Sequence, residues 1–119
     1  LFRSENVEVL RAFRAQCRTL VAVGACAITG GLPAQRNHLD IGDCLRAVYV
    51  DAPGVVHGRV PDDPELPLPL DKVYPIQEIV KVDVFVPGCP PSADVLWAVL
   101  SDLLAGREPV LSPHQVRYD

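Results

Sequence analysis

Hydrophobic and polar residues along the chain follow the periods of helices separated by short apolar strands. From residue 4, apolar side chains recur every three or four positions and acidic residues occupy the first turn, so the sequence predicts a helix capped by Ser4. The apolar stripe of this helix comprises Val7, Leu10, Phe13 and Cys17. Residues 19–25 form an almost wholly apolar, β-branched run, which is typical of a strand buried on both faces.

A loop, a shorter helix and a long irregular segment are expected next. Residues 26–37 contain two adjacent glycines and a proline, which predict a loop. A shorter helix is expected over residues 43–50. Residues 51–75 contain six prolines, two glycines and five acidic residues, and they predict a long Pro-rich surface loop. A loop of this length is either a linker or a surface that contacts a partner, and the sequence leaves both open.

The last part of the chain predicts a strand followed by a helix. A helical turn is expected near residues 76–81, a strand over 82–86, and a final helix that begins at Pro91 or Ser92 and stops at Gly106. Trp97 is expected on the side of this helix that packs in the protein core. The buried stripe is predicted to comprise Val95, Leu96, Val99, Leu100, Leu103 and Leu104. Helices that alternate with apolar strands indicate an α/β fold with a parallel sheet.

Composition narrows the class of protein. The chain has 119 residues, 49% of them hydrophobic, and a net charge of −4, which suits one domain with a modest core. Its longest apolar stretch near the start, residues 20–26, is far shorter than the roughly 18 residues that cross a bilayer, so a soluble protein without a membrane partner is expected. The mild acidity and the lack of basic runs argue against nucleic-acid binding.

Two of the four cysteines are candidate metal ligands because of their positions along the chain. Cys26 and Cys89 each follow a predicted strand directly, and the carboxyl ends of parallel strands meet at one edge of a sheet. The prolines at 87, 90 and 91 restrict the backbone around Cys89, and Gly88 permits a close approach. Rigid thiolates suit a metal centre. Small buried hydrophobic residues are the alternative interpretation, and spacing alone leaves both open.

The remaining candidate ligands are interpreted as structural. Cys17 and Cys44 fall at helical positions and are expected to pack as small apolar residues. A disulfide is disfavoured because nothing indicates secretion. His38, His57 and His114 lack metal-ligand spacing and are expected to be structural or solvated. The glycine pair lacks the spacing and the lysine of a phosphate-binding loop.

Three stretches of sequence resemble a known family. They are "VGACAITGGLPAQRN", "KVYPIQEIVKVDVFVPGCPPSADVLWAVLSDLLAG" and the terminal "RYD". Together they resemble the carboxyl-terminal part of the small, iron-sulfur subunit of cytoplasmic NAD-reducing nickel-iron hydrogenases. That subunit is similar in turn to the 20 kDa subunit of NADH:quinone oxidoreductase, complex I. The ending and the stretch "GGLPAQRN" favour the hydrogenase.

The resemblance implies a fold, a cofactor and partners. It implies a flavodoxin-like three-layer α/β fold, present over residues 1–119 as an incomplete carboxyl-terminal portion of one iron-sulfur domain. Cys26 and Cys89 would ligate a 4Fe-4S cluster, with the other two ligands upstream of Leu1, and no residue would be catalytic. The subunit would relay electrons in the cytoplasm between the nickel-iron site of the hydrogenase large subunit and diaphorase subunits, which hold FMN and further iron-sulfur clusters and reduce NAD.

Further expectations follow from the same resemblance. About 60 to 100 residues are expected before Leu1, from the usual size of such a domain. Arg36 and Asn37 are expected to contact the large subunit, because of their place in the loop. The alternatives are a complex I type subunit that passes electrons to quinone, and a flavodoxin-like binding module without a cluster.

Overall fold

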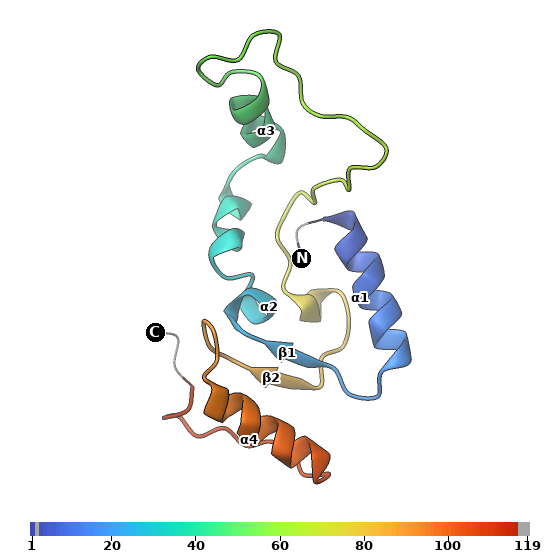
Figure 1. Ribbon diagram of the computed structural model, residues 1–119, viewed down its shortest axis with the longest axis vertical. Coiled ribbons are helices and arrows are strands. Elements are labelled where there is room, and N and C mark those ends of the chain that lie inside the picture. The colour runs from blue at the N-terminus through green and yellow to red at the C-terminus, as the bar shows by residue number, and fades with distance from the viewer. Residues whose placement is uncertain (2, 117–119) are drawn as a thin grey trace.

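The computed structural model describes Leu1 and residues 3–116, and Figure 1 shows how their helices and strands follow one another. In chain order the elements are α1 (Ser4–Gln16), β1 (Val21–Val23), α2 (Ala25–Thr29), the 3-10 helix η1 (Leu32–His38), α3 (Ile41–Tyr49), the 3-10 helix η2 (Ile76–Glu78), β2 (Val84–Val86) and α4 (Ala93–Leu104). The structure describes every residue between Tyr49 and Ile76, where the prolines are concentrated, and none of these belongs to a helix or a strand.

The two strands form a parallel pair although about 60 residues separate them. Val21 pairs with Val84, Ala22 with Phe85 and Val23 with Val86. β-branched residues suit the extended backbone, and the connection between the strands contains helices, as a parallel pairing requires. The prediction of an α/β fold with a parallel sheet is therefore confirmed.

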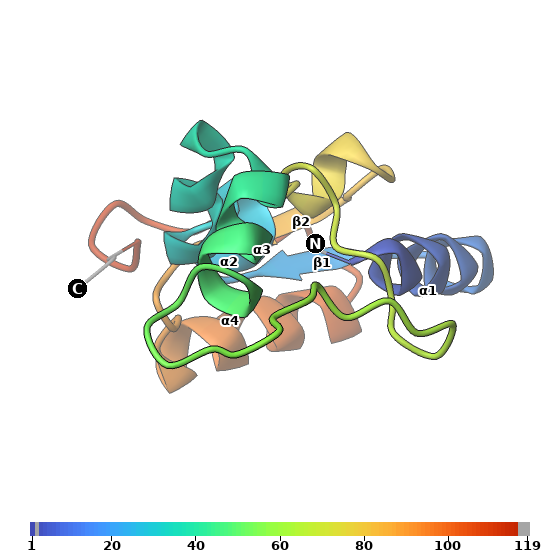
Figure 2. The same ribbon diagram turned by 90° about the horizontal axis from the view of Figure 1, so that it is seen from above.

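The main core lies between the sheet and α4. Val86, Val95 and Val99 are buried together, and five partly buried residues pack against them: Val21, Val84, Leu96, Leu103 and Leu111. Figure 2 shows α4 running along one face of the strands. Ser92 starts this helix by accepting a hydrogen bond on Oγ from the Val95 N–H at 3.3 Å. The Ser92 cap and the packed valines fix α4 against β2. They thereby hold both ends of the loop that carries Cys89.

Part of the apolar surface predicted to be buried on α4 is uncovered. Leu100 and Leu104 are exposed, and Trp97, expected in the core, keeps 73% of its surface exposed. These three side chains lie at helical spacing on a face that no described residue of this chain covers. The pattern was right about the helix, but the expectation that this face is buried within the chain is wrong.

The helix α1 also departs from its prediction. Its N-cap is Arg3, which makes no capping side-chain bond, and Ser4 is already helical. Arg3 is extended because it forms an isolated bridge with Pro69, and the Ser4 N–H donates to the Leu68 carbonyl at 3.0 Å. None of the residues of α1 is buried, and Phe13 is 65% exposed. The returning chain near residue 69, rather than a serine cap, therefore sets the start of this helix.

Three predicted boundaries differ from those of the structure. The first strand covers three residues instead of seven, and Val23 is 45% exposed, so it is not buried on both faces. The expected loop at 26–37 contains α2 and η1. α3 starts earlier than predicted because the Asp40 carboxylate accepts from the Asp43 N–H at 3.1 Å and acts as its cap.

The molecule is elongated. Its extents are 59 × 33 × 20 Å and its radius of gyration is 18.2 Å, against roughly 13–14 Å for a compact domain of this length. The helix α3 and the irregular chain after it account for this shape, since they project from the end that holds the sheet (Figure 1). In the part of the chain that the structure describes, no helix has the length and apolarity needed to cross a bilayer.

A carboxylate joins α1 to both strands. Asp83 Oδ2 accepts from the Leu20 N–H at 2.9 Å and lies 3.2 Å from Arg14 Nη1, and Lys81 Nζ lies 3.8 Å from Oδ1. The backbone hydrogen bond from Leu20, helped by the two cations, holds the pKa of Asp83 below its ordinary value. The ionised carboxylate therefore favours the folded chain.

Replacing this carboxylate should change how stability depends on pH. A lowered folded-state pKa stabilises the protein above the unfolded value of about 4, and this contribution is lost as the pH falls through the folded value. Asp83→Asn should therefore lower the urea midpoint of the full-length subunit at pH 7, and the difference from wild type should narrow below about pH 4. A gap that stays constant down to pH 3 would contradict this.

Candidate metal centre

The two strands deliver Cys26 and Cys89 to the same edge of the sheet. The chain leaves β1 through Gly24, whose N–H donates to the Val86 carbonyl at 2.8 Å. One residue later, the Ala25 N–H donates to the Gly88 carbonyl, also at 2.8 Å. Ala25 immediately precedes Cys26, and Gly88 immediately precedes Cys89. This hydrogen bond therefore joins the backbone just before the two cysteines. The backbone segments that carry the two cysteines therefore meet at this edge, as the predicted parallel pairing requires.

The thiols at this edge are accessible. Cys26 and Cys89 are both free and exposed, whereas Cys17 and Cys44 are free and partly buried. The Cys17 sulfur also lies 3.6 Å from Arg14 Nη1, at the end of α1. Cys17 and Cys44, expected to pack as small apolar residues, are thus only partly buried, and the ligand role of Cys26 and Cys89 stays a prediction.

Glycines allow the chain to approach the thiols closely. Gly31 has a φ of 55°, and a Cβ added there would lie 2.8 Å from Cys26 Sγ. Gly88 has a φ of 144°, and a Cβ there would lie 2.5 Å from Pro91 Cα. Neither position tolerates a side chain without displacement of its neighbours. The Cys89–Pro90 peptide bond is cis.

A side-chain clamp supports the loop that carries Cys26. Asn37 Nδ2 donates to the Val73 carbonyl at 3.0 Å, and the Val73 N–H donates to Asn37 Oδ1 at 2.7 Å. Arg36 Nη2 donates to the Leu70 carbonyl at 2.8 Å. Both side chains bind backbone of their own chain, and their expected contact with the large subunit stays a prediction. They tie η1 to the segment that returns from the Pro-rich region.

The clamp is linked to Cys26 through packing. Val73 is buried, and a Cβ added to Gly30 would lie 3.6 Å from its Cγ1. Gly30 precedes Gly31, which packs on the Cys26 sulfur. Gln77 adds a second tie because its side-chain amide donates to the Ile28 carbonyl in α2. The position of this thiol thus depends on residues from three separate stretches of chain.

The described residues do not form a complete metal site by themselves. Among Leu1 and residues 3–116, no three His, Cys, Asp or Glu side chains gather in a way that could hold a metal ion. His38, His57 and His114 are exposed, as their sequence context predicted. Two neighbouring thiols at a sheet edge can supply half of a four-thiolate ligand set.

Comparison with known proteins decides the family. Residues 3–103 match the family model described as NADH ubiquinone oxidoreductase, 20 Kd subunit. The chain belongs to this family. Both cysteines of the candidate site lie inside the matched region, while residues 117–119, which carried part of the resemblance, lie outside the described residues.

Proteins similar to this chain include hydrogenase subunits. The chain is 47% identical over 118 residues to the NAD-reducing hydrogenase HoxS subunit delta of Cupriavidus necator, a match that covers 97% of this chain and 56% of the relative. It is 32% identical over 110 residues to a subunit of the F420-non-reducing hydrogenase of Methanothermobacter marburgensis, covering 91% and 35%. The chain thus spans about half, or about a third, of the length of these relatives.

A solved structure agrees in fold as well as sequence. A chain in the crystal structure of an NAD+-reducing [NiFe]-hydrogenase in the H2-reduced state matches with a TM-score of 0.95 and 55% identity, covering 100% of this chain and 67% of that one. The resemblance predicted from the sequence motifs is therefore confirmed.

Proposed function

We propose that this chain is part of the electron-relay subunit of an NAD-reducing nickel-iron hydrogenase, and that Cys26 and Cys89 hold an iron-sulfur cluster in it. The observation that carries the proposal is that two exposed cysteines follow residues joined by one backbone hydrogen bond, the 2.8 Å bond from Ala25 to Gly88 at the sheet edge. The 47% and 55% identities to NAD-reducing hydrogenase chains support the same assignment.

The donor set fits a cluster of the 4Fe-4S type. Such clusters take four cysteine thiolates, and this chain offers two at the edge of its sheet. We propose that the other two come from polypeptide that precedes Leu1. The close packing of Gly31 leaves Cys26 little freedom, and the prolines after Gly88 do the same for Cys89.

The chain's own residues would position the cluster rather than perform acid-base chemistry. When bound, the cluster supplies one-electron transfer between neighbouring redox centres. Cys26 and Cys89 act as anionic ligands. The clamp of Asn37 on Val73 keeps the Cys26 loop in place, so that little rearrangement accompanies a change of charge at the thiolates. No residue of this chain is assigned a bond-breaking role.

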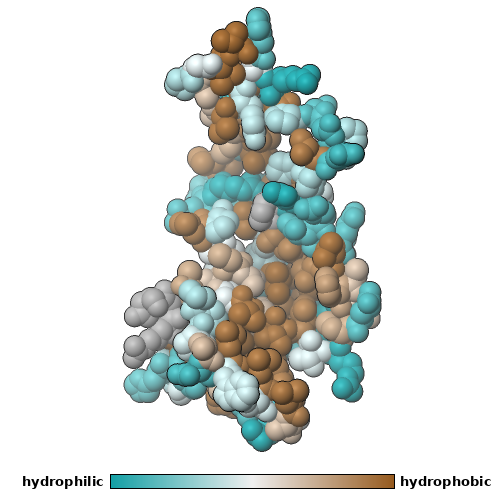
Figure 3. Space-filling view, viewed as in Figure 1, coloured by the Kyte–Doolittle hydropathy of each residue, from teal (hydrophilic) through white to brown (hydrophobic). Residues whose placement is uncertain are grey.

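We propose that the partners are a large subunit with the nickel-iron site and diaphorase subunits with FMN and further iron-sulfur clusters, in the cytoplasm. Unburied apolar surface supports a multisubunit setting. Figure 3 shows apolar side chains at the surface over the end that holds the sheet and again on the projecting segment. Sixteen large hydrophobic residues are exposed among those the structure describes, including Trp97 and Leu104. Surfaces of this kind mark sites of protein association.

Purification of the natural complex tests the proposed function. A tagged full-length subunit should bring down a nickel-containing subunit and flavin-containing subunits, with iron and acid-labile sulfide in the tagged chain and hydrogen-dependent NAD reduction. Reduction with hydrogen should produce an iron-sulfur signal in low-temperature electron paramagnetic resonance (EPR). Quinone reduction with membrane partners would instead favour the complex I type. A stable monomer without iron would leave only the binding module.

A further inference from the structure

The segment of residues 39–71, which we call the arm, has no buried residue of its own. It comprises α3 and the irregular chain that follows. Its exposed large apolar side chains are Leu39, Val48, Tyr49, Val55, Val56, Leu66 and Leu68. Fixing the backbone costs about 1–2 kcal/mol per residue, and burial of apolar surface normally offsets that cost. Nothing in the described chain covers this apolar surface.

The arm nevertheless has a defined shape. Its base is tied to the body, because the Ser4 N–H donates to the Leu68 carbonyl at 3.0 Å and Arg36 donates to the Leu70 carbonyl at 2.8 Å. Its outer part folds back at Gly58, where an added Cβ would collide with the Tyr49 carbonyl and lie 2.8 Å from Val50 Cα. The chain after α3 therefore folds back against the end of that helix, and it then swings out to the side before it returns to the body (Figure 1).

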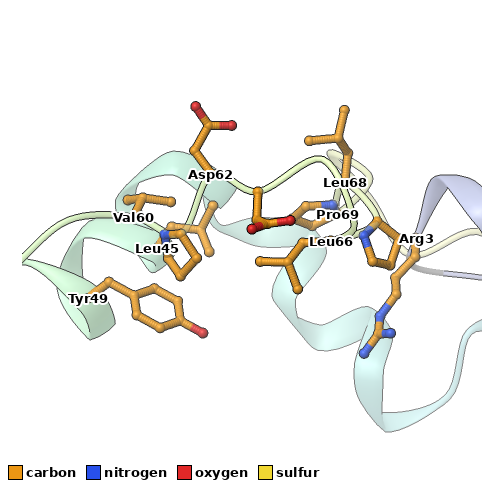
Figure 4. Close-up of a pocket in the computed structure, with 11 residues that line it drawn as sticks. Arg3, Leu45, Tyr49, Val60, Asp62, Leu66, Leu68 and Pro69 are labelled. Carbon is orange, nitrogen blue, oxygen red and sulfur yellow. The ribbon is translucent and has the colours of Figure 1, made fainter.

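A hollow of about 370 Å³ lies between α3 and the returning chain. Leu45 and Tyr49 line it from the helix, and Val60, Asp62, Asp63 and Leu66 line it from the return segment. Figure 4 shows Leu45, Tyr49 and Val60 gathered at one end and Arg3 at the other. The walls of the hollow are mostly apolar, Asp62 and Asp63 lie along its edge with the Asp62 carboxylate pointing outward, and Arg3 lies at the far end (Figure 4).

The charge of the arm indicates what covers it. Residues 39–71 hold seven acidic and two basic side chains, a formal charge of −5, while the whole chain carries only −4. The excess of acidic over basic side chains is therefore confined to the arm. A complementary partner presents Lys or Arg beside apolar side chains.

We propose that the arm is a docking element for another protein subunit, and that its hollow receives a Lys or Arg side chain from an apolar segment of that subunit. The aliphatic stem would pack against Leu45 and Leu66, and the cationic head would emerge at the edge of the hollow to meet the carboxylates of Asp62 and Asp63. The inference rests on the proposed function only for the class of partner, a subunit of the hydrogenase complex.

Two measurements on the complete complex test the docking. First, a photo-reactive residue at Leu66 of the full-length chain should crosslink to a peptide of the large or diaphorase subunits that contains Lys or Arg. Second, the double variant Asp62→Asn and Asp63→Asn, which keeps the side-chain volumes, should speed dissociation of that subunit about tenfold at roughly 0.15 M salt. Asp51→Asn is the control for a change of arm charge away from the hollow, because Asp51 does not line the hollow and lies 3.9 Å from Arg46 Nε.

The outcomes separate this inference from the proposed function. Unchanged dissociation of the double variant, or crosslinks only to a second copy of this chain or to a non-protein molecule, would overturn the docking proposal. The EPR signal of the tagged chain should be the same in all three proteins, since none of these residues adjoins the thiols. If the arm docks as expected but the complex contains no cluster iron, the proposed function is refuted and the docking role of the arm stands.

Discussion

Cys26→Ser and Cys89→Ser variants of the full-length subunit should lose most of their cluster iron and their EPR signal. Each change removes one thiolate from the proposed ligand set, and close packing holds the backbone there, so no other group moves in to replace it. Hydrogen-dependent NAD reduction should fall about a hundredfold or more, because damage around a metal site already costs up to that factor when only supporting residues change. Iron counts on the purified complex provide the measurement.

The other two cysteines provide the control. Cys17→Ser and Cys44→Ser place a hydroxyl at partly buried positions and should cost about 1–3 kcal/mol of stability where the hydroxyl finds no partner, with the EPR signal intact. If a Cys17 or Cys44 variant lost the signal while the Cys26 and Cys89 variants kept it, the ligand assignment would fail.

Gly31→Ala should disturb the same site without touching a ligand. Its Cβ would lie 2.8 Å from Cys26 Sγ and 3.1 Å from Cys26 Cα, at a φ of 55° that disfavours any side chain. We expect a loss of about 1–3 kcal/mol of stability and a marked fall in cluster occupancy. Thermal unfolding and iron content of the full-length subunit measure the two effects separately.

Gly54→Ala is the matched control for this change. Gly54 also has a positive φ, 86°, but a Cβ added there, on the arm, would meet nothing within 4 Å. It should show the backbone penalty of about 1 kcal/mol and no loss of iron. Equal iron content in the Gly31 and Gly54 variants would show that close packing on the sulfur does not matter for the site.

Local signals in the sequence predicted most of the elements. The Ser92 cap and the apolar spacing behind it located α4, and two β-branched runs located the strands. The position of Cys26 and Cys89 after those strands was enough to predict their convergence, because parallel pairing fixes which ends meet. These inferences held because each depends on neighbouring residues or on one general rule of topology.

Non-local contacts left no comparable signal. Asn37 and Val73 are 36 positions apart, and neither their residue types nor their separation along the chain predicts the two hydrogen bonds between them. The glycine pair before Pro33 indicated only a loop, whereas Gly31 serves to admit the Cys26 sulfur. For Trp97 the sequence predicted burial that the structure does not show. An apolar pattern indicates that a face is buried, but it does not indicate whether the same chain or another one buries it.

The parallel pairing of β1 with β2 has a consequence for how such chains diversify. The connection between them is about 60 residues long, and loop-closure entropy grows only with the logarithm of length, by about 0.6 kcal/mol for each doubling. Insertions or deletions in the arm therefore hardly affect the meeting of the two thiols. Evolution can reshape the connection for a new neighbour while the cysteine edge stays unchanged.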